Sequence, residues 1–318
     1  MKKLLPIIII FVLCIIFPII AGLVAPAPVP APDKPSPSES PLPPKEIKCL
    51  NITTGQVSVI NLEDHLVGVL AAEMPADYHI EALKAQAVAA RSYILNKSEA
   101  PNDQHPEAHI CTDSKHCKGW LSEKEAKAKW KTEDRNRNWK KLKSAVHATK
   151  GEYMIYDSHA IEACFFASSG GRTENSEDVW GGSRPYLKSV ESAESINQQV
   201  RTSTVTVNCS HFAAALGISL PPGTVPTFRN LTRTAGGSVA EVEICGKTFK
   251  GTQIRSIFGL KSANFTVTAD STNVTFSVLG YGHGVGMSQL GAHYMAESGQ
   301  KYTEILSHYY TNIQIAKI

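Results

Sequence analysis

Two histidines and two cysteines share one short stretch of the sequence: His105, Cys111, His116 and Cys117. Residues 102–120 show no helical or strand periodicity, so we expect a loop there. Two imidazoles and two thiolates form a complete tetrahedral ligand set for zinc, and a loop lets all four converge. Four protein ligands leave no open position, so such a zinc ion would be structural. The alternative is a Cys111–Cys117 disulfide, which is common in exported domains.

A single carboxylate, Glu73, follows the apolar residues 69–72 and precedes Pro75. Removal from water raises the pKa of a carboxyl group, which suits a general acid. The ends of the two helices expected on either side act on this charge in opposite directions. From the residues alone, a solvated turn glutamate is therefore the equal alternative.

The glycine-rich segment 280–292 contains His283. Glycines allow a ligand to approach the backbone closely, but they do not specify one, so His283 is either a ligand contact or a turn residue. The sequence has no nucleophile elbow, no phosphate-binding loop and no HExxH motif. We therefore expect neither nucleotide nor zincin chemistry. Cys164, Cys209 and Cys245 are expected to be buried thiols or to include one disulfide.

The elements that must position these residues are mixed. Periodicity and capping signals predict helices over residues 62–72, 75–95, 124–150, 288–298 and 303–310, and strands over 56–60, 153–156 and 160–166. Short β segments with Gly/Pro turns fill about 195–278, a candidate β-rich sub-domain beside the main catalytic domain. The lysine-rich stretch 124–150 is read as a solvated helix face rather than a polyanion-binding patch. Without a regular βαβ alternation, this order favours the α+β class.

The composition is that of a globular protein. The chain has 318 residues, 32 Lys+Arg against 29 Asp+Glu, and 42% hydrophobic residues, which excludes collagen-like and disordered chains. Seven cysteines in this length are too few for a small disulfide scaffold. The net charge of +3 gives no reason to expect nucleic-acid binding.

The first 47 residues are expected to lie outside the folded core. Lys2 and Lys3 precede an uncharged apolar run over residues 4–24, which as a helix would span about 31 Å and cross a bilayer. We predict an uncleaved anchor over residues 1–24, with the N-terminus in the cytoplasm; a cleaved signal peptide is the alternative. Residues 25–47 are proline-rich and form an extended linker. Residues 48–318 are then an extracytoplasmic domain.

Five separated motifs carry a family resemblance: LVGVLAAEMP at 66–75, EALKAQAVAARSY at 81–93, SGGRTENSEDVW at 169–180, PYLKSV at 185–190 and GHGVGMSQLG at 282–291. In this order they resemble the stage II sporulation protein D family, membrane-anchored lytic transglycosylases of endospore-forming bacteria. The motifs span nearly the whole predicted ectodomain. The resemblance is therefore a specific one.

The resemblance implies which residues carry the chemistry. It places the family's catalytic acid/base on Glu73 and its other catalytic residues on Arg91, Tyr186 and Lys188. Arg91 and Lys188 are expected to hold a carboxylate or polarise N-acetyl groups, and Tyr186 to orient the sugar or relay a proton. The His/Cys cluster resembles the zinc site of clostridial members. Many relatives carry His-Ser where this chain has Phe166-Ala167, so any binding role of that histidine is absent or moved.

The implied reaction is cleavage of the β-1,4 bond between MurNAc and GlcNAc in denuded peptidoglycan strands, during engulfment in sporulation. Glycoside hydrolases usually need two carboxylates. A lytic transglycosylase uses the muramyl C6 hydroxyl as nucleophile, so one glutamate serves as acid and then as base, and a 1,6-anhydroMurNAc end forms. The implied partners are stage II sporulation protein P, an amidase/endopeptidase, and stage II sporulation protein M. The implied location is the mother-cell membrane, with the ectodomain facing the engulfment space.

Two other functional hypotheses remain. The same domain type resembles that of amidase enhancers, so the chain could be a non-catalytic glycan-binding enhancer of a cell-wall amidase. A purely structural ectodomain with a zinc loop is the third reading, but it leaves Glu73, Arg91 and Tyr186 without a purpose. Cleavage of glycan by this chain alone would distinguish the first two.

Overall fold

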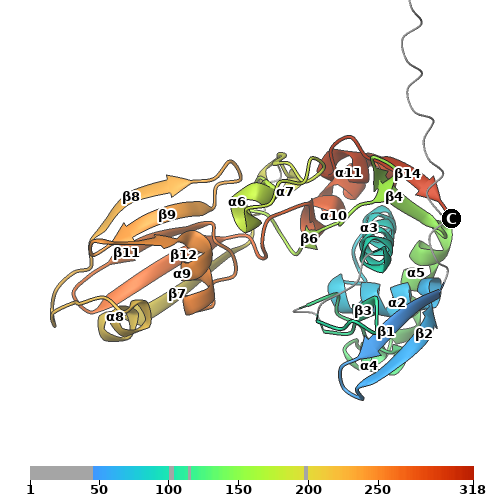
Figure 1. The fold of residues 1–318 in the computed structure, drawn as a ribbon, viewed down its shortest axis with the longest axis horizontal. Coiled ribbons are helices and arrows are strands. Elements are labelled where there is room, and N and C mark those ends of the chain that lie inside the picture. The colour runs from blue at the N-terminus through green and yellow to red at the C-terminus, as the bar shows by residue number, and fades with distance from the viewer. Residues whose placement is uncertain (1–45, 100–103, 114–115, 197–199) are drawn as a thin grey trace, which may run out of the picture. The chain divides into compact units, whose positions relative to one another are not determined.

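The computed structural model describes residues 46–99, 104–113, 116–196 and 200–318 (Figure 1). No helix within these ranges is long and apolar enough to cross a membrane. The expected anchor and residues 25–45 of the expected linker lie outside the described ranges. Both therefore remain predictions.

Helix α3 (Ile80–Ser98) is the centre of the first hydrophobic core (Figure 1). It contacts four helices and three strands: α2 (Leu62–Glu73), α5 (Arg135–Ala148), α10 (Gln289–Glu297), α11 (Tyr302–Tyr309), β3 (Ile110–Cys111), β4 (Glu152–Tyr156) and β5 (His159–Ala160). Its alanines Ala82, Ala85, Ala87, Ala89 and Ala90 have no exposed surface. Because these side chains are small, neighbouring elements can pack close to α3 on several sides.

Helix α2 begins and ends where its sequence requires. The Asn61 side chain accepts hydrogen bonds from the backbone N–H groups of Glu63 and Asp64 and so caps the first turn. Met74 is extended, with φ −132° and ψ 139°, because the ring of Pro75 disfavours the helical conformation for the residue that precedes it. Glu73 is therefore the last residue of the helix.

Short strands surround this core. In one sheet β1 (Glu46–Asn51) pairs with β2 (Gln56–Asn61) and, in parallel, with β3 (Ile110–Cys111). In a second sheet β4 lies between β14 (Gln314–Lys317) and β5 (His159–Ala160). A third pairing joins β6 (Phe165–Phe166) to β13 (Met287–Ser288). The shorter helices in this part are α4 (Glu123–Ala128), α6 (Ser176–Trp180) and α7 (Ala193–Ile196).

A second hydrophobic cluster is built by residues 202–279. One antiparallel sheet contains β7 (Thr202–Asn208), β12 (Asn273–Leu279) and β11 (Phe265–Ala269), and the other contains β8 (Phe228–Arg233), β9 (Val239–Ile244) and β10 (Lys247–Lys250). Helices α8 (Cys209–Leu216) and α9 (Gly251–Phe258) belong to the same part (Figure 1). The Phe212 and Phe258 rings stack with centroids 5.3 Å apart.

The α+β class is confirmed, and the structure corrects several element boundaries. The helix predicted from residue 75 begins at Ile80, because residues 75–79 form a turn whose last residue, His79, caps α3 through its ring nitrogen. The single helix predicted over 124–150 is two helices, α4 and α5, separated by a turn at 129–134. The strand predicted over 160–166 is only β5 and β6, since residues 161–164 pair with no strand.

Candidate functional site

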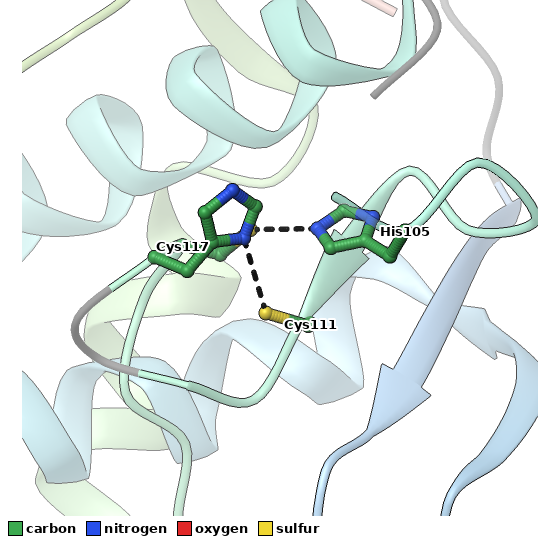
Figure 2. A group of neighbouring side chains, drawn as sticks. His105, Cys111 and Cys117 are labelled. Atoms are coloured by element: carbon green, nitrogen blue, oxygen red, sulfur yellow. Dashed lines mark hydrogen bonds between the residues drawn. The ribbon is translucent and has the colours of Figure 1, made fainter. Parts of the chain in front are cut away.

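The four predicted metal ligands converge, and their ligand atoms all lie within 4.8 Å of one another. His105 Nε2 lies 3.2 Å from Cys117 Sγ. His116 Nδ1 lies 3.5 Å from Cys111 Sγ and 3.4 Å from Cys117 Sγ. Figure 2 shows the His105 ring and the Cys111 sulfur pointing into the same space. The cluster is therefore a group that could bind a metal ion such as zinc.

The donor set fits a tetrahedral ion. Zinc bonds of about 2.3 Å to sulfur and about 2.0–2.1 Å to nitrogen place neighbouring ligand atoms about 3.5 Å apart. The Nδ1–H of His105 donates to the Ala108 carbonyl at 2.8 Å, which fixes the ring and leaves Nε2 as the ligand atom. Burial raises the pKa of the Cys117 thiol to about 12. A thiolate at neutral pH therefore needs a cation beside it.

The cysteines of the described residues are all free thiols. The alternative Cys111–Cys117 disulfide is therefore absent, and so is any disulfide among Cys164, Cys209 and Cys245. Cys49 is a neighbour of the cluster that the sequence analysis did not consider. It lies on β1 beside β3, and burial, together with the nearby Cys111, raises its pKa to about 11.

The loop that carries the metal ligands continues directly to Glu73. The backbone N–H of Gly119 donates to Glu73 Oε1 at 2.9 Å. Glu73 is half-buried at the end of α2. Because Gly119 is two residues beyond Cys117, the position of the predicted ligands and the position of the Glu73 carboxylate are linked through three consecutive residues.

Lys118 lies in the same loop, between the metal ligands and Gly119. Its ammonium lies 3.9 Å from the centroid of the Phe165 ring and 4.4 Å from that of Tyr93, at the distances of cation–π contacts. Burial lowers the pKa of Lys118, and the nearby carboxylates of Glu73 and Glu162 act in the opposite direction. The side chain keeps part of its surface exposed.

Glu162 connects this group to Tyr186. Its carboxylate forms ion pairs with Lys97 at 3.0 Å and with Arg184 at 3.3 Å. Burial alone would raise the pKa of Glu162, but these two cations lower it. Its backbone N–H donates to the Tyr186 hydroxyl at 3.2 Å. The structure thus brings Glu73, Lys118, Glu162 and Tyr186 into one connected neighbourhood.

Arg91 lies elsewhere. Its Nε and Nη2 donate to the two carboxylate oxygens of Glu63 at 2.9 and 2.7 Å, and its Nη1 donates to the Glu152 carbonyl at 2.8 Å. The guanidinium side chain has no exposed surface. Glu63 is at the start of α2 and Glu73 at its end, about 15 Å apart along the axis. In this conformation Arg91 therefore offers no surface to a ligand.

Lys188 also has an anionic partner. Its ammonium contacts Glu177 Oε1 at 2.6 Å and Ser183 Oγ at 3.3 Å. Glu177 belongs to α6, and both side chains are more than a third exposed. No contact joins Lys188 to Glu73 or Lys118 among the residues that the structure describes. Lys188 is therefore held against α6 through Glu177.

The glycine-rich segment closes another side of this neighbourhood. The His283 ring lies 5.7 Å from the Phe166 ring and 5.1 Å from that of Trp180, which is 52% exposed. Burial, aided by the nearby Lys118, lowers the pKa of His283 to about 3. Gly282 has φ +126°, and a Cβ there would lie 2.6 Å from the Phe166 Cβ. Phe166 thus packs directly under this segment.

Sequence reasoning missed Lys118, Tyr93 and Glu162. Lys118 had one available signal, since it directly follows the predicted ligand Cys117. Tyr93 lies inside the motif at 81–93 but reads as a core residue of α3. Nothing in the sequence near Glu162 indicates that it meets Lys97 and Arg184, which come from distant segments.

Comparisons with known proteins show similarity to one family of sporulation proteins. Residues 51–156 match the SpoIID family, described as stage II sporulation protein. The chain is 38% identical to stage II sporulation protein D of Bacillus amyloliquefaciens over 86% of this chain and 79% of that protein. It is 37% identical to stage II sporulation protein D of Bacillus subtilis over 86% of this chain and 80% of that protein.

A more distant similarity has a different functional name. The amidase enhancer of Bacillus subtilis is 30% identical over 77% of this chain, but the match covers only 39% of that protein. The two sporulation proteins therefore share much more of their length with this chain than the amidase enhancer does.

Proposed function

This chain belongs to the stage II sporulation protein (SpoIID) family, and from that premise we propose that it is a peptidoglycan lytic transglycosylase. It cleaves the β-1,4 bond between MurNAc and GlcNAc in denuded strands during engulfment. The observation that carries the proposal is the half-buried Glu73 carboxylate, bound by the Gly119 N–H and close to the Lys118 ammonium.

Glu73 acts first as an acid and then as a base. The Gly119 N–H holds Oε1, which leaves Oε2 to carry the proton. That proton passes to the glycosidic oxygen as its bond to the muramyl C1 breaks. The muramyl C6 hydroxyl bonds to C1 and returns its proton to Oε2. A 1,6-anhydro bridge forms, and no water is consumed.

The other predicted residues support this reaction from different places. The Tyr186 hydroxyl accepts the Glu162 N–H, so its own proton is free to donate to a sugar or to a proton relay. The proposal gives Lys188, which is paired with Glu177 of α6, the role of binding the glycan beyond the reacting bond. Arg91 is a positioning residue, because its buried guanidinium joins α2 to α3 and β4.

We assign one structural zinc ion to His105, Cys111, His116 and Cys117. When bound, it supplies four bonds that cross-link the loop, and with no open position it activates no water. The chain's own contribution is the short connection from Cys117 to Gly119. The ligands thereby fix the backbone N–H that holds Glu73.

The location and partners follow from the family. Residues 1–24 anchor the chain in the mother-cell membrane, residues 25–47 hold the catalytic domain away from it, and residues 48–318 face the engulfment space. Stage II sporulation protein P prepares the substrate by removing stem peptides, and stage II sporulation protein M is the membrane partner.

Mass spectrometry of denuded glycan strands incubated with the full-length protein tests the activity. We expect anhydromuramyl ends with the wild-type chain and none with Glu73→Gln, which keeps the size of the side chain but cannot ionise. Reducing ends without the anhydro bridge would instead indicate a hydrolase. A hydrolase would need a second catalytic carboxylate. Glu162 is the candidate to examine first, because Lys118 is close to both Glu73 and Glu162.

The second candidate function is a non-catalytic enhancer of a cell-wall amidase. The 30% identity to the amidase enhancer favours it. A folded wild-type chain that cuts no glycan alone, but increases the rate of an added amidase, would replace the transglycosylase proposal with this one.

A further inference from the structure

We propose that Lys118 is the cation that binds the lactyl carboxylate of a muramyl residue beside Glu73, and that it thereby selects strands whose lactyl carboxylates are free. The inference rests on the proposed function, because it names a group of the same substrate in the same site. It assigns Lys118 a role that the sequence had given to Arg91 and Lys188.

Lys118 is a partly buried cation whose ammonium contacts two aromatic rings. Among residues 46–99, 104–113, 116–196 and 200–318, no carboxylate forms an ion pair with its ammonium. The faces of Phe165 and Tyr93 hold it at 3.9 and 4.4 Å from their centroids. Aromatic faces position a cation while leaving its hydrogen-bond donors unused. Leaving a buried charge unpaired is unfavourable, which is a reason to expect an anionic ligand at this point.

The neighbouring cations are already engaged. Lys97 and Arg184 both pair with Glu162, and Lys188 pairs with Glu177. The Arg91 guanidinium is enclosed and bonded to Glu63. Within the described ranges, Lys118 is thus the basic residue near Glu73 that forms no ion pair, and the residue is partly accessible to solvent.

The loop places this cation next to the reacting group. Lys118 directly precedes Gly119, whose N–H holds Glu73 Oε1, and its charge interacts with that of Glu73. A ligand group on Lys118 is therefore held close to the glutamate. In a muramyl residue the lactyl group branches from the sugar that contains C1 and the C6 hydroxyl, so holding its carboxylate also orients those two atoms.

The chemistry of the lactyl group explains the selection. In a denuded strand it ends in a carboxylate, which forms charge-assisted hydrogen bonds with an ammonium. In a strand that carries stem peptides the same carbon is part of a neutral amide. Lys118 would bind the amide more weakly, because the buried charge would then lack an anion. The site would discriminate through charge as well as size.

Binding of two matched ligands tests the proposal. Titration calorimetry uses the full-length protein with Glu73→Gln, so that no strand is cut. One ligand is a denuded MurNAc–GlcNAc tetrasaccharide, and the other is the same tetrasaccharide with its lactyl carboxylates converted to primary amides. We expect the carboxylate form to bind about ten- to a hundred-fold more tightly. Equal affinities would overturn the proposal without any further variant.

Variants at position 118 assign the preference to this residue. Each substitution is added to the Glu73→Gln protein. Lys118→Met, or Lys118→Gln as a second neutral variant, should remove the preference for the carboxylate ligand, whereas Lys118→Arg should retain it. Lys140→Met is the matched control, because Lys140 is exposed on α5; it should change neither affinity. A preference that persists in a folded, metal-loaded Lys118→Met or Lys118→Gln protein would overturn the assignment.

The outcomes separate this inference from the proposed function. Cleavage by the wild-type chain without any carboxylate preference refutes the role of Lys118 alone. A carboxylate preference that depends on Lys118, without cleavage, supports the binding role and refutes the transglycosylase. Metal content and melting temperature measured for each variant show whether the neighbouring ligand Cys117 has been disturbed.

Discussion

At the scale of single residues, the partner of a basic side chain decides what it can do. Arg91, Lys118 and Lys188 all have the charge needed to hold a carboxylate. The Arg91 guanidinium is bonded along one edge to Glu63 and through Nη1 to the Glu152 carbonyl, and Lys188 is paired with Glu177. The Lys118 ammonium contacts two aromatic rings, and within the described ranges it forms no ion pair. Residue type and motif therefore select candidates, but the bonding of each candidate distinguishes a binding group from a positioning group.

Replacing Arg91 should reduce stability rather than ligand affinity. Arg91→Ala leaves the Glu63 carboxylate and the Glu152 carbonyl without their buried donor, and we expect it to lower the free energy of unfolding by about 3 kcal/mol. Urea denaturation measures this change. Arg137→Ala is the control, because Arg137 is 71% exposed and pairs only with Asp134; we expect a change below about 1 kcal/mol. An Arg91→Ala protein of unchanged stability but weakened glycan binding would contradict the positioning role.

At the scale of elements, two features determine where Glu73 lies. The first is α2, whose start is fixed by Asn61 and Arg91 and whose end is fixed by the turn before Pro75. The second is the loop 116–119, which brings a backbone donor from the metal ligands to the carboxylate. Neither the helix nor the loop alone defines the geometry of the site.

Loss of the metal should therefore affect both folding and the site. We expect Cys111→Ser to lose bound zinc and to lower the melting temperature by several degrees or more, since structural zinc contributes directly to folding. Atomic emission and differential scanning calorimetry measure the two quantities. Cys245→Ser is the control, because Cys245 is a free thiol outside the cluster. A metal-free Cys111→Ser protein with wild-type stability and activity would show that the cluster is dispensable.

The elements that local signals specify were predictable, and those that depend on distant contacts were not. The strands predicted over 153–156 and 160–166 require a tight turn between them, and Asp157 and Ser158 there have positive φ, at 51° and 65°, as a type I′ hairpin turn requires. The ligand cluster was predictable because its members share one loop. The predicted start of α3 at residue 75 was wrong, because Pro75 is equally compatible with the turn that precedes His79. Local sequence offered only the neighbouring ligand Cys117 as a signal for Lys118, because the aromatic rings that contact its ammonium come from α3 and β6.

At the scale of the whole molecule, the two hydrophobic clusters are joined by polar groups that the chain buries. The backbone of Glu174 donates to Gly284, and its carboxylate accepts the Ser238 N–H. Glu174 is 2% exposed, and its Oε2 has no hydrogen-bond partner within the described part of the chain. Its burial between Gly236 and Gly284 favours a structural role.

Buried neutral histidines should make the stability of the molecule depend on pH. His65 stacks on Trp120 with ring centroids 5.8 Å apart, and burial lowers its pKa to about 4 from an ordinary value of 6.5. Between these values the unfolded chain binds a proton that the folded chain does not. The contribution of His65 to the free energy of unfolding is therefore fully present above about pH 6.5. It decreases as the pH falls towards 4, by about 3 kcal/mol in all.

The contribution of His65 can be separated from metal release, which also occurs as the pH falls because ligand histidines take up protons. Urea denaturation at several pH values should show a smaller decrease in stability at low pH for His65→Gln than for the wild-type chain. The decrease caused by metal release should be the same in both proteins. His211→Gln, at an exposed position on α8, should reproduce the wild-type slope. Equal slopes for wild-type and His65→Gln would mean that His65 takes up its proton without unfolding, because water or a local rearrangement solvates the ring.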